Sequence, residues 1–191
     1  MTVLRQSIHL TKSADGTAIA WAYAGDGPPL VKAGNWLTHL EYDLKSPIWH
    51  HWCQFLGDTY RLIRYDERGC GMSDRNVAEL SLDASVQDLE AVVEAARPPE
   101  PFVLFGISQG GATAVRYAVA HPDKVSRLIT IGTPHRGSLF AHVFPGRSLA
   151  QMRPKDAWLA DLAEDHRRNG DDAAGVPIVS LWSWHDSMVV P

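Results

Sequence analysis

The segment VLFGISQGGATAV, residues 103–115, decides the fold of this chain. An apolar run typical of a buried strand leads directly into a Gly-Ile-Ser-Gln-Gly turn, and an alanine-rich run typical of a helix follows. Gly106 and Gly110 leave room for a sharp reversal with Ser108 at its apex. Because the positive end of the helix then points at Ser108, the pattern predicts a serine nucleophile, with the backbone N–H of Gln109 as one oxyanion donor. The alternative is a glycine-rich turn that Ser108 only caps.

Short strand-like runs alternate with helical periodicity along the chain, which favours an α/β fold with a mostly parallel sheet. Residues 5–12 and 17–25 flank the turn SADG and predict an antiparallel hairpin at the N-terminal sheet edge. Residues 134–175 are too long for a plain connection and predict a helical, lid-like segment within a single domain of residues 1–191. Further strands are expected at residues 29–34, 60–66, 101–108, 125–132 and 176–183, and helices at residues 46–57, 81–96 and 108–122.

The composition is that of an ordinary globular protein, with 45% hydrophobic and 21% charged residues in a chain of 191 residues. A net charge of −4 offers no electrostatic reason for binding nucleic acid or an anionic membrane. No run approaches the ~18 apolar residues of a membrane span, and the N-terminus has no secretory pattern, so we expect a cytoplasmic location. Cys53 and Cys70 form no CxxC pair, and we expect no metal and no other cofactor.

Two further segments, taken with the Ser108 turn, resemble the α/β-hydrolase family over nearly the whole chain. Residues 64–74, RYDERGCGMSD, carry the Asp-x-Arg-Gly-x-Gly-x-Ser pattern that follows the fourth strand in many members. Residues 33–43, AGNWLTHLEYD, stand where the family places its second oxyanion donor. The resemblance implies an α/β-hydrolase fold, with the backbone N–H of Trp36 as that donor and Asn35 as the neighbour that shapes the turn and contacts substrate.

Three polar side chains of these two segments carry alternative interpretations. His39 lines the entrance to the site, or it is a histidine of the loop alone. Asp66 and Arg68 are expected to pin their loop through a buried ion pair rather than to contact substrate.

The C-terminal third resembles bacterial triacylglycerol lipases, whereas the N-terminal part resembles small hydrolase domains that are sometimes joined to regulatory modules. The lipase-like pattern lies in residues 129–144, ITIGTPHRGSLFAHVF, and in residues 176–191, VPIVSLWSWHDSMVVP. In those lipases the acid of the triad closes a Ser-x-x-Asp pattern after a strand. The resemblance therefore implies Asp186 as the acid, and Trp184 belongs to the tryptophans expected to line an apolar cleft. A mosaic sequence is an open alternative.

The triad histidine of the family comes after the acid, on a loop that follows one more strand. Only five residues follow Asp186, so we expect the sheet to lack its last strand and helix and the site to lack its usual histidine. His185, beside Asp186, and His135, in GTPHRG, are the substitute bases that we consider. Three explanations stay open: a truncated hydrolase, a base recruited from elsewhere in the chain or from a second subunit, and a catalytically silent member. A sheet edge left exposed would favour pairing into a homo-oligomer.

The function that these observations predict is hydrolysis of carboxylic esters of short or medium acyl chains, through an acyl-enzyme on Ser108. The expected partner is therefore a small-molecule ester. A binding module without catalysis, or a truncated fragment, is the main alternative. A C–C bond hydrolase or a cofactor-free perhydrolase is a second one, because the same serine turn serves those reactions.

Overall fold

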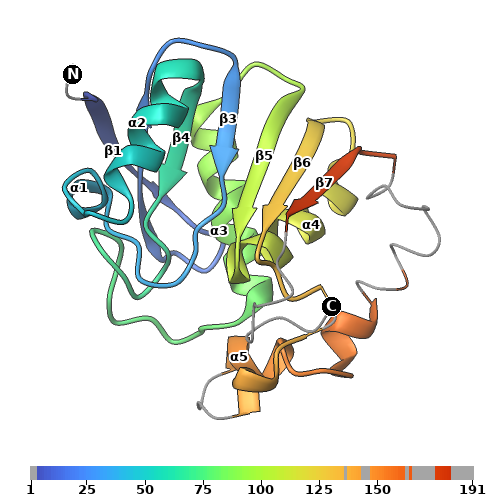
Figure 1. Ribbon diagram of the computed structural model, residues 1–191. Helices are drawn as coiled ribbons and strands as arrows, with labels where there is room; N and C mark the ends of the chain where they lie inside the picture. The colour runs from blue at the N-terminus through green and yellow to red at the C-terminus, as the bar shows by residue number, and fades with distance from the viewer. Residues whose placement is uncertain (1–3, 136, 143–146, 162–163, 165–174, 182–191) are drawn as a thin grey trace.

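The computed structural model describes residues 4–135, 137–142, 147–161, 164 and 175–181 (Figure 1). Seven strands form one mixed sheet in the order β1-β2-β4-β3-β5-β6-β7. The strands are β1 (Gln6–Lys12), β2 (Ala18–Ala24), β3 (Pro29–Lys32), β4 (Arg61–Tyr65), β5 (Phe102–Ile107), β6 (Val125–Ile131) and β7 (Ile178–Leu181). The helices whose first and last residues the structure describes are α1 (Leu40–Asp43), α2 (His50–Thr59), α3 (Leu82–Ala96), α4 (Gln109–Ala120), the 3₁₀ helix η1 (Leu139–His142) and α5 (Arg147–Gln151).

The antiparallel part of the sheet lies at the N-terminal edge, as the sequence predicts. β1 pairs with β2 and β2 with β4, both antiparallel, whereas β4, β3, β5, β6 and β7 are parallel to one another. The turn of the first hairpin closes through the N–H of Ser13, which donates to the carbonyl of Thr17 at 2.8 Å. Gly16 lies in this turn with φ 87°, a conformation that glycine adopts without steric cost.

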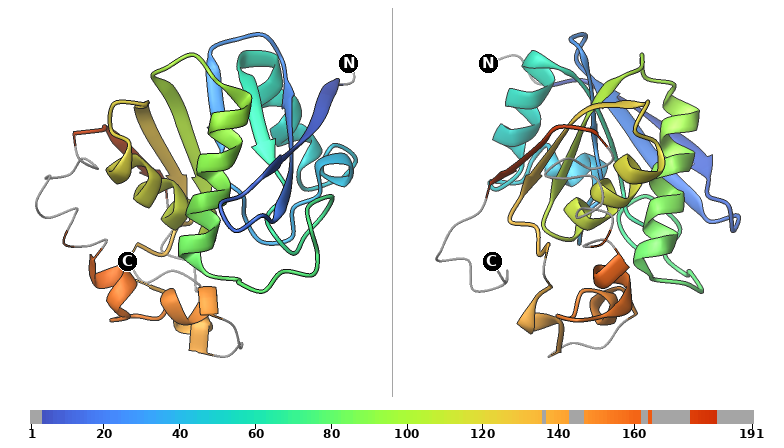
Figure 2. Two further views of the ribbon diagram at one scale, coloured as in Figure 1. Left: turned by 180° about the vertical axis from the view of Figure 1, so that it is seen from behind. Right: turned by 90° about the vertical axis from the view of Figure 1, so that its right-hand side faces the viewer.

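The sheet is covered on both faces, so its central strands are buried on both sides. α3 and α4 cover one face and α2 covers the other, as the end-on view of Figure 2 shows. Alternate residues of β5 therefore enter different cores: Phe102 and Leu104 join the larger cluster beside α4, and Phe105 packs with Leu56 of α2. Each fully buried side chain of this size contributes about 1.5–3 kcal/mol to folding.

The helix α3 shows how local signals set the element boundaries. It begins after Ser81, whose hydroxyl accepts a hydrogen bond from the N–H of Ala84 at 3.2 Å. It ends at Arg97, which has φ 45° and closes the helix in the left-handed conformation. The chain then continues as Pro98-Pro99, which cannot extend a helix.

The described part of residues 134–175 lies beyond the carboxyl ends of the parallel strands, below their arrowheads in Figure 1. Two contacts tie it to the first turn of α3: Gln151 accepts from the N–H of Leu82 at 2.8 Å, and the indole N–H of Trp158 donates to Asp83 at 2.8 Å. A lid-like role for this segment stays a prediction. Over the residues that the structure describes, we find no helix with the length and apolar character to span a membrane.

Candidate active site

Ser108 occupies the turn between β5 and α4 in a strained backbone conformation. Its φ of 52° and ψ of −124° lie in a region that non-glycine residues rarely adopt, and such a conformation costs about 1–3 kcal/mol. Two backbone hydrogen bonds hold it there: the N–H of Ser108 donates to the carbonyl of Ile131 at 2.9 Å, and the N–H of Gly111 donates to the carbonyl of Ser108 at 3.0 Å. The half-buried serine thus stands directly before the first residue of a helix.

The glycines around Ser108 are required by close packing of the turn. A Cβ atom at Gly106 would lie 2.5 Å from the Cα of Gly111, and one at Gly110 would lie 2.5 Å from the carbonyl oxygen of Gly34. A Cβ atom at Gly111 would clash with the hydroxyl of Thr133. The start of α4 therefore lies in backbone contact with the loop after β3, and only small residues allow this.

That contact brings the two segments with predicted oxyanion donors together. Gln109 is the first residue of α4, and the first N–H groups of a helix have no acceptor within it. Trp36 belongs to the loop after β3, and its side chain is 70% exposed. Leu37 follows with φ 62°, a strained conformation for a large apolar residue. The assignment of the two backbone N–H groups as oxyanion donors stays a prediction.

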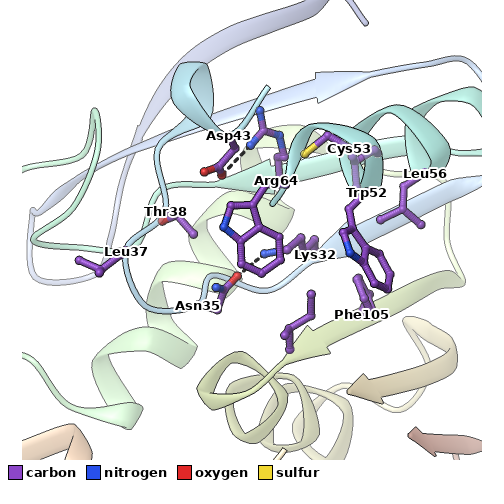
Figure 3. A pocket seen from close by; sticks show the side chains of 13 residues that line it. Lys32, Asn35, Leu37, Thr38, Asp43, Trp52, Cys53, Leu56, Arg64 and Phe105 are labelled. Carbon is purple, nitrogen blue, oxygen red and sulfur yellow. Dashed lines mark hydrogen bonds and ion pairs between the residues drawn. The ribbon is translucent and has the colours of Figure 1, made fainter. Parts of the chain in front are cut away.

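Asn35 is 7% exposed and lies between Lys32 and the backbone of Trp36. The ammonium of Lys32 donates a short hydrogen bond to the side-chain oxygen of Asn35, and the amide of Asn35 donates to the carbonyl of Trp36 at 3.5 Å. Figure 3 shows Lys32 directed at Asn35 from β3. Lys32 was not among the predicted site residues, although a lysine that closes an apolar strand is the sequence signal for it.

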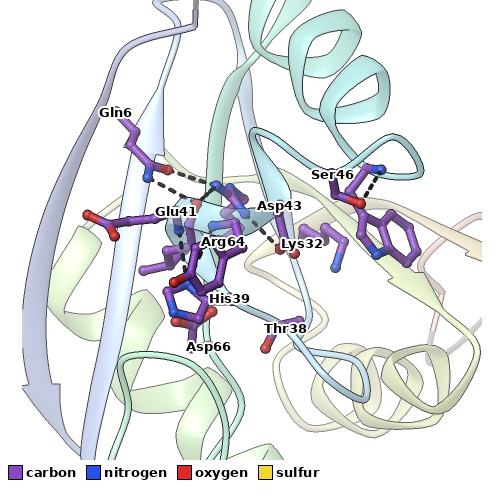
Figure 4. Close-up of polar contacts among 12 residues, drawn as sticks. Gln6, Lys32, Thr38, His39, Glu41, Asp43, Ser46, Arg64 and Asp66 are labelled. Carbon is purple, nitrogen blue, oxygen red and sulfur yellow. Dashed lines mark hydrogen bonds and ion pairs between the residues drawn. The ribbon is translucent and has the colours of Figure 1, made fainter.

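His39 acts as the N-cap of α1. Its Nδ1 atom accepts hydrogen bonds from the N–H groups of Glu41 at 3.3 Å and Tyr42 at 3.5 Å, and its ring lies 4.2 Å from that of Tyr42 (Figure 4). These contacts give His39 a structural role in the loop that carries the predicted oxyanion donor. A contact of His39 with substrate stays a prediction.

Of the two predicted bases and the predicted acid, the structure describes only His135. Nε2 of His135 lies 3.2 Å from the hydroxyl of Thr130 and 3.3 Å from that of Ser180, so its ring is held where β6 and β7 end. Asp186, His185 and Trp184 lie outside the described residues. Of the predicted triad, the structure describes Ser108 and the candidate base His135, and the catalytic roles of all members stay predictions.

The buried ion pair expected in residues 64–74 exists, but its carboxylate belongs to α3. Arg68 donates to Asp88 from Nη2 at 2.6 Å and from Nε at 2.7 Å, and to Asp15 from Nη1 at 2.7 Å. Asp66 instead accepts from the N–H of Met72 at 2.8 Å. Arg68 thus fixes this loop to the hairpin and to α3.

Glu67 connects this loop to the residue after the candidate nucleophile. Its carboxylate accepts a 2.8 Å hydrogen bond from the side-chain amide of Gln109, and its N–H donates to the hydroxyl of Thr38 at 2.9 Å. Only 8% of Glu67 is exposed. Burial, and secondly the nearby carboxylate of Asp88, raise the pKa of Glu67 to about 7, against the opposing charges of Lys32 and Arg68. The sequence offered no pattern that pairs Glu67 with Gln109.

Replacing Glu67 by glutamine is expected to stabilise the protein more at pH 8 than at pH 4.5. The pKa of Glu67 rises from an ordinary value of 4.5 to about 7 on folding, so folding is favoured by the protonated form. This contribution is complete below pH 4.5 and is lost as the pH rises to 7, by about 3 kcal/mol. Urea unfolding of both proteins across this range measures the difference.

The exposed Glu94 of α3 provides the matched control, and Glu94→Gln should change stability equally at all these pH values. A difference between wild type and Glu67→Gln that does not vary with pH would contradict the assignment of Glu67 as a buried, titrating carboxyl group.

Among the described residues, no group of three or more His, Cys, Asp or Glu is arranged to hold a metal ion.

Comparison with known proteins relates most of the chain to one family. Residues 42–189 match the family model described as alpha/beta hydrolase fold. The mouse protein named palmitoyl-protein thioesterase ABHD10, mitochondrial, is 29% identical over 136 residues, which are 70% of this chain and 44% of that protein. The pimeloyl-[acyl-carrier protein] methyl ester esterase of Aliivibrio salmonicida is 32% identical over 120 residues, 63% of this chain and 41% of that protein.

One of the similar solved structures is that of an esterase. The esterase RhEst1 from Rhodococcus sp. ECU1013 superimposes with a TM-score of 0.55 at 32% identity, over 66% of this chain and 46% of that one. The chain spans less than half the length of these relatives.

Proposed function

The chain belongs to the alpha/beta hydrolase family, and we propose that it hydrolyses carboxylic esters through an acyl-enzyme on Ser108. The observation that carries this proposal is the backbone of Ser108, held at φ 52° and ψ −124° immediately before α4. Such a strained turn costs stability and presents the hydroxyl above the end of the strand. A serine that only capped the helix would not need this conformation.

In the proposed reaction the oxygen of Ser108 attacks the ester carbonyl, and its proton passes to a general base. The negative charge that develops on the carbonyl oxygen is stabilised by the backbone N–H groups of Gln109 and Trp36. The base then protonates the departing alcohol, and water releases the acid from Ser108 by the reverse steps. We assign the acid of the triad to Asp186 and the base to a histidine, with His185 and His135 as the candidates.

The proposed substrate class rests on the names of the relatives. One relative is named a methyl ester esterase and one solved structure an esterase, which supports oxygen esters. Thioesters are a second candidate class, because another relative is named a palmitoyl-protein thioesterase. The cytoplasmic location and the homo-oligomer through a sheet edge stay predictions.

A fluorophosphonate that reacts only with activated serines tests the proposal. We expect one adduct per chain in the intact mass, and fragmentation that places the adduct on Ser108. Ser126, exposed on β6, is the internal control and should stay unlabelled. Urea-unfolded protein should not react, since the activation depends on the fold. An unlabelled native protein would contradict the proposal and favour a binding module without catalysis.

A further inference from the structure

A small, partly open pocket lies between α2 and the carboxyl ends of β3, β4 and β5 (Figure 3). Its volume is about 20 Å³, which is room for one or two water molecules or for one carboxylate group. Asn35 of the loop after β3 lines it, and so does Ile107, the residue before Ser108. The pocket therefore adjoins the candidate nucleophile, on the face of the sheet that α2 covers.

The ammonium of Lys32 lies in this pocket with neutral partners. It donates to the side-chain oxygen of Asn35 and to the carbonyl of Ala33 at 3.4 Å, and it lies 5.9 Å from the ring of Trp49. No carboxylate in the described part of the chain forms an ion pair with Lys32. Lys32 is half-buried, and Asp43 and Glu67 act on it only from beyond ion-pair distance, so an anion that enters the pocket would gain a direct contact with the ammonium.

The one carboxylate that lines the pocket is already bound to another cation. Asp43 accepts from Nη1 of Arg64 at 3.0 Å, and Figure 4 shows Arg64 directed toward Asp43 and Gln6. The pocket thus contains two cations, Lys32 and Arg64, against one carboxylate, and the excess positive charge is on Lys32.

The shape and the walls of the pocket limit the anion that fits. The small volume of about 20 Å³ and the ammonium of Lys32 as the donor favour a small planar carboxylate over a larger anion. The side chains of Trp49, Trp52 and Phe105 form apolar walls against which the carbon atoms next to a carboxylate can pack.

We propose that the Lys32 pocket binds one carboxylate group of a small organic acid, and that the ester hydrolysed at Ser108 carries such a free carboxylate. The first part rests on the pocket alone. The second part rests on the proposed function, and it follows because the lining residue Ile107 directly precedes Ser108. A half-ester of a short dicarboxylic acid is the substrate class that combines the two groups.

Desolvation lowers the pKa of Lys32 to about 8, so the binding of a carboxylate should depend on pH. The ionisable groups that face Lys32 are Asp43 on α1, Arg64 on β4, Cys53 on α2 and Glu67 after β4. Burial raises the pKa of the Cys53 thiol above its ordinary value of 9.0, and Glu67 is ionised above about pH 7. Measurements at pH 7.5 and 9.5 therefore change mainly the charge of Lys32.

Titration of the wild-type protein with succinate, followed by tryptophan fluorescence, tests the first part, because Trp49 and Trp52 line the pocket. We expect saturable binding at pH 7.5 that weakens about 20-fold at pH 9.5, and no binding of the neutral succinamide. Lys32→Met should lose binding at least about 10-fold, whereas the matched control Lys45→Met, at an exposed position, should bind as wild type does.

The pH dependence of wild type makes the test independent of whether Lys32→Met folds. Equal affinity at both pH values, equal binding of succinamide, or a folded Lys32→Met protein that binds succinate normally would each overturn the proposal. Any of these results would show that the pocket does not bind a carboxylate and holds only water.

The substrate part is tested by comparing monomethyl glutarate with methyl pentanoate, followed by NMR. We expect kcat/KM at pH 7.5 to be at least about 10-fold higher for the acid-bearing ester. If succinate binds but both esters react equally, the substrate part is wrong. If succinate binds while neither ester reacts and no phosphonate adduct forms, the proposed function fails and the carboxylate pocket stands.

Discussion

Ser108→Ala is expected to lower the turnover of a short-chain chromogenic ester by about 10⁴- to 10⁶-fold, down to the background of the assay. The substitution removes the only atom that forms the acyl-enzyme in the proposed reaction. It leaves the turn and both predicted oxyanion donors in place, since alanine and serine differ by one oxygen. Steady-state kinetics of the two purified proteins measure the effect on kcat/KM.

Ser108→Gly is the matched control for the backbone of the turn. Its turnover should be lost equally, but glycine adopts the observed φ of 52° and ψ of −124° without strain. Relief of about 1–3 kcal/mol exceeds the entropic cost of a glycine, so this variant should be more stable than Ser108→Ala by about 1 kcal/mol. An alanine variant that retains turnover would place the nucleophile elsewhere.

Asp88→Asn is expected to destabilise the protein by about 3–5 kcal/mol, the largest loss of stability that we predict. Asp88 is fully buried and accepts two hydrogen bonds from Arg68, whose side chain is 1% exposed. An asparagine removes the buried counter-charge of the guanidinium and leaves it paired with Asp15, whose side chain is 40% exposed. Urea or guanidinium unfolding at pH 7 measures the change in the free energy of unfolding.

Asp15→Asn is the matched control, because Asp15 pairs with the same guanidinium from the protein surface. Its side chain is 40% exposed, and its removal should cost no more than about 1 kcal/mol. Equal losses for the two variants would show that the burial of Asp88 does not decide the strength of the ion pair.

Most of the fold follows from local patterns in the sequence. The antiparallel hairpin, the strands at residues 102–107 and 125–131 and the helix after Ser108 appear where alternation and apolar runs predict them. The predictions were less accurate where a few residues decide a boundary. α2 begins at His50 rather than at residue 46, because the hydroxyl of Ser46 caps a turn that precedes the helix. The helix α1 has only four residues, which are too few to show a helical periodicity in the sequence.

The turn at Ser108 and the helix start at Gln109 were predictable, because their structure depends on residues that are close in sequence, whereas the residues packed around them were less predictable. Lys32 was not proposed, because the sequence does not show that α2 and the loop after β3 pack around this lysine and form a pocket. For His39 the sequence left open whether it lines the entrance or only belongs to the loop, and the structure shows that its ring caps α1. Burial and cap geometry are properties of the folded chain.

By itself, the sequence determined the elements and the turn at residue 108, because glycine spacing, apolar runs and capping residues act within a few positions of the chain. Only the tertiary structure decided which side chains meet at the carboxyl edge. Glu67 reaches Gln109, and Arg68 reaches Asp88, because the loop after β4 lies beside the start of α4 and beside α3. Such pairs join residues that are distant in sequence, and their strength depends on a loss of solvent that no local pattern records.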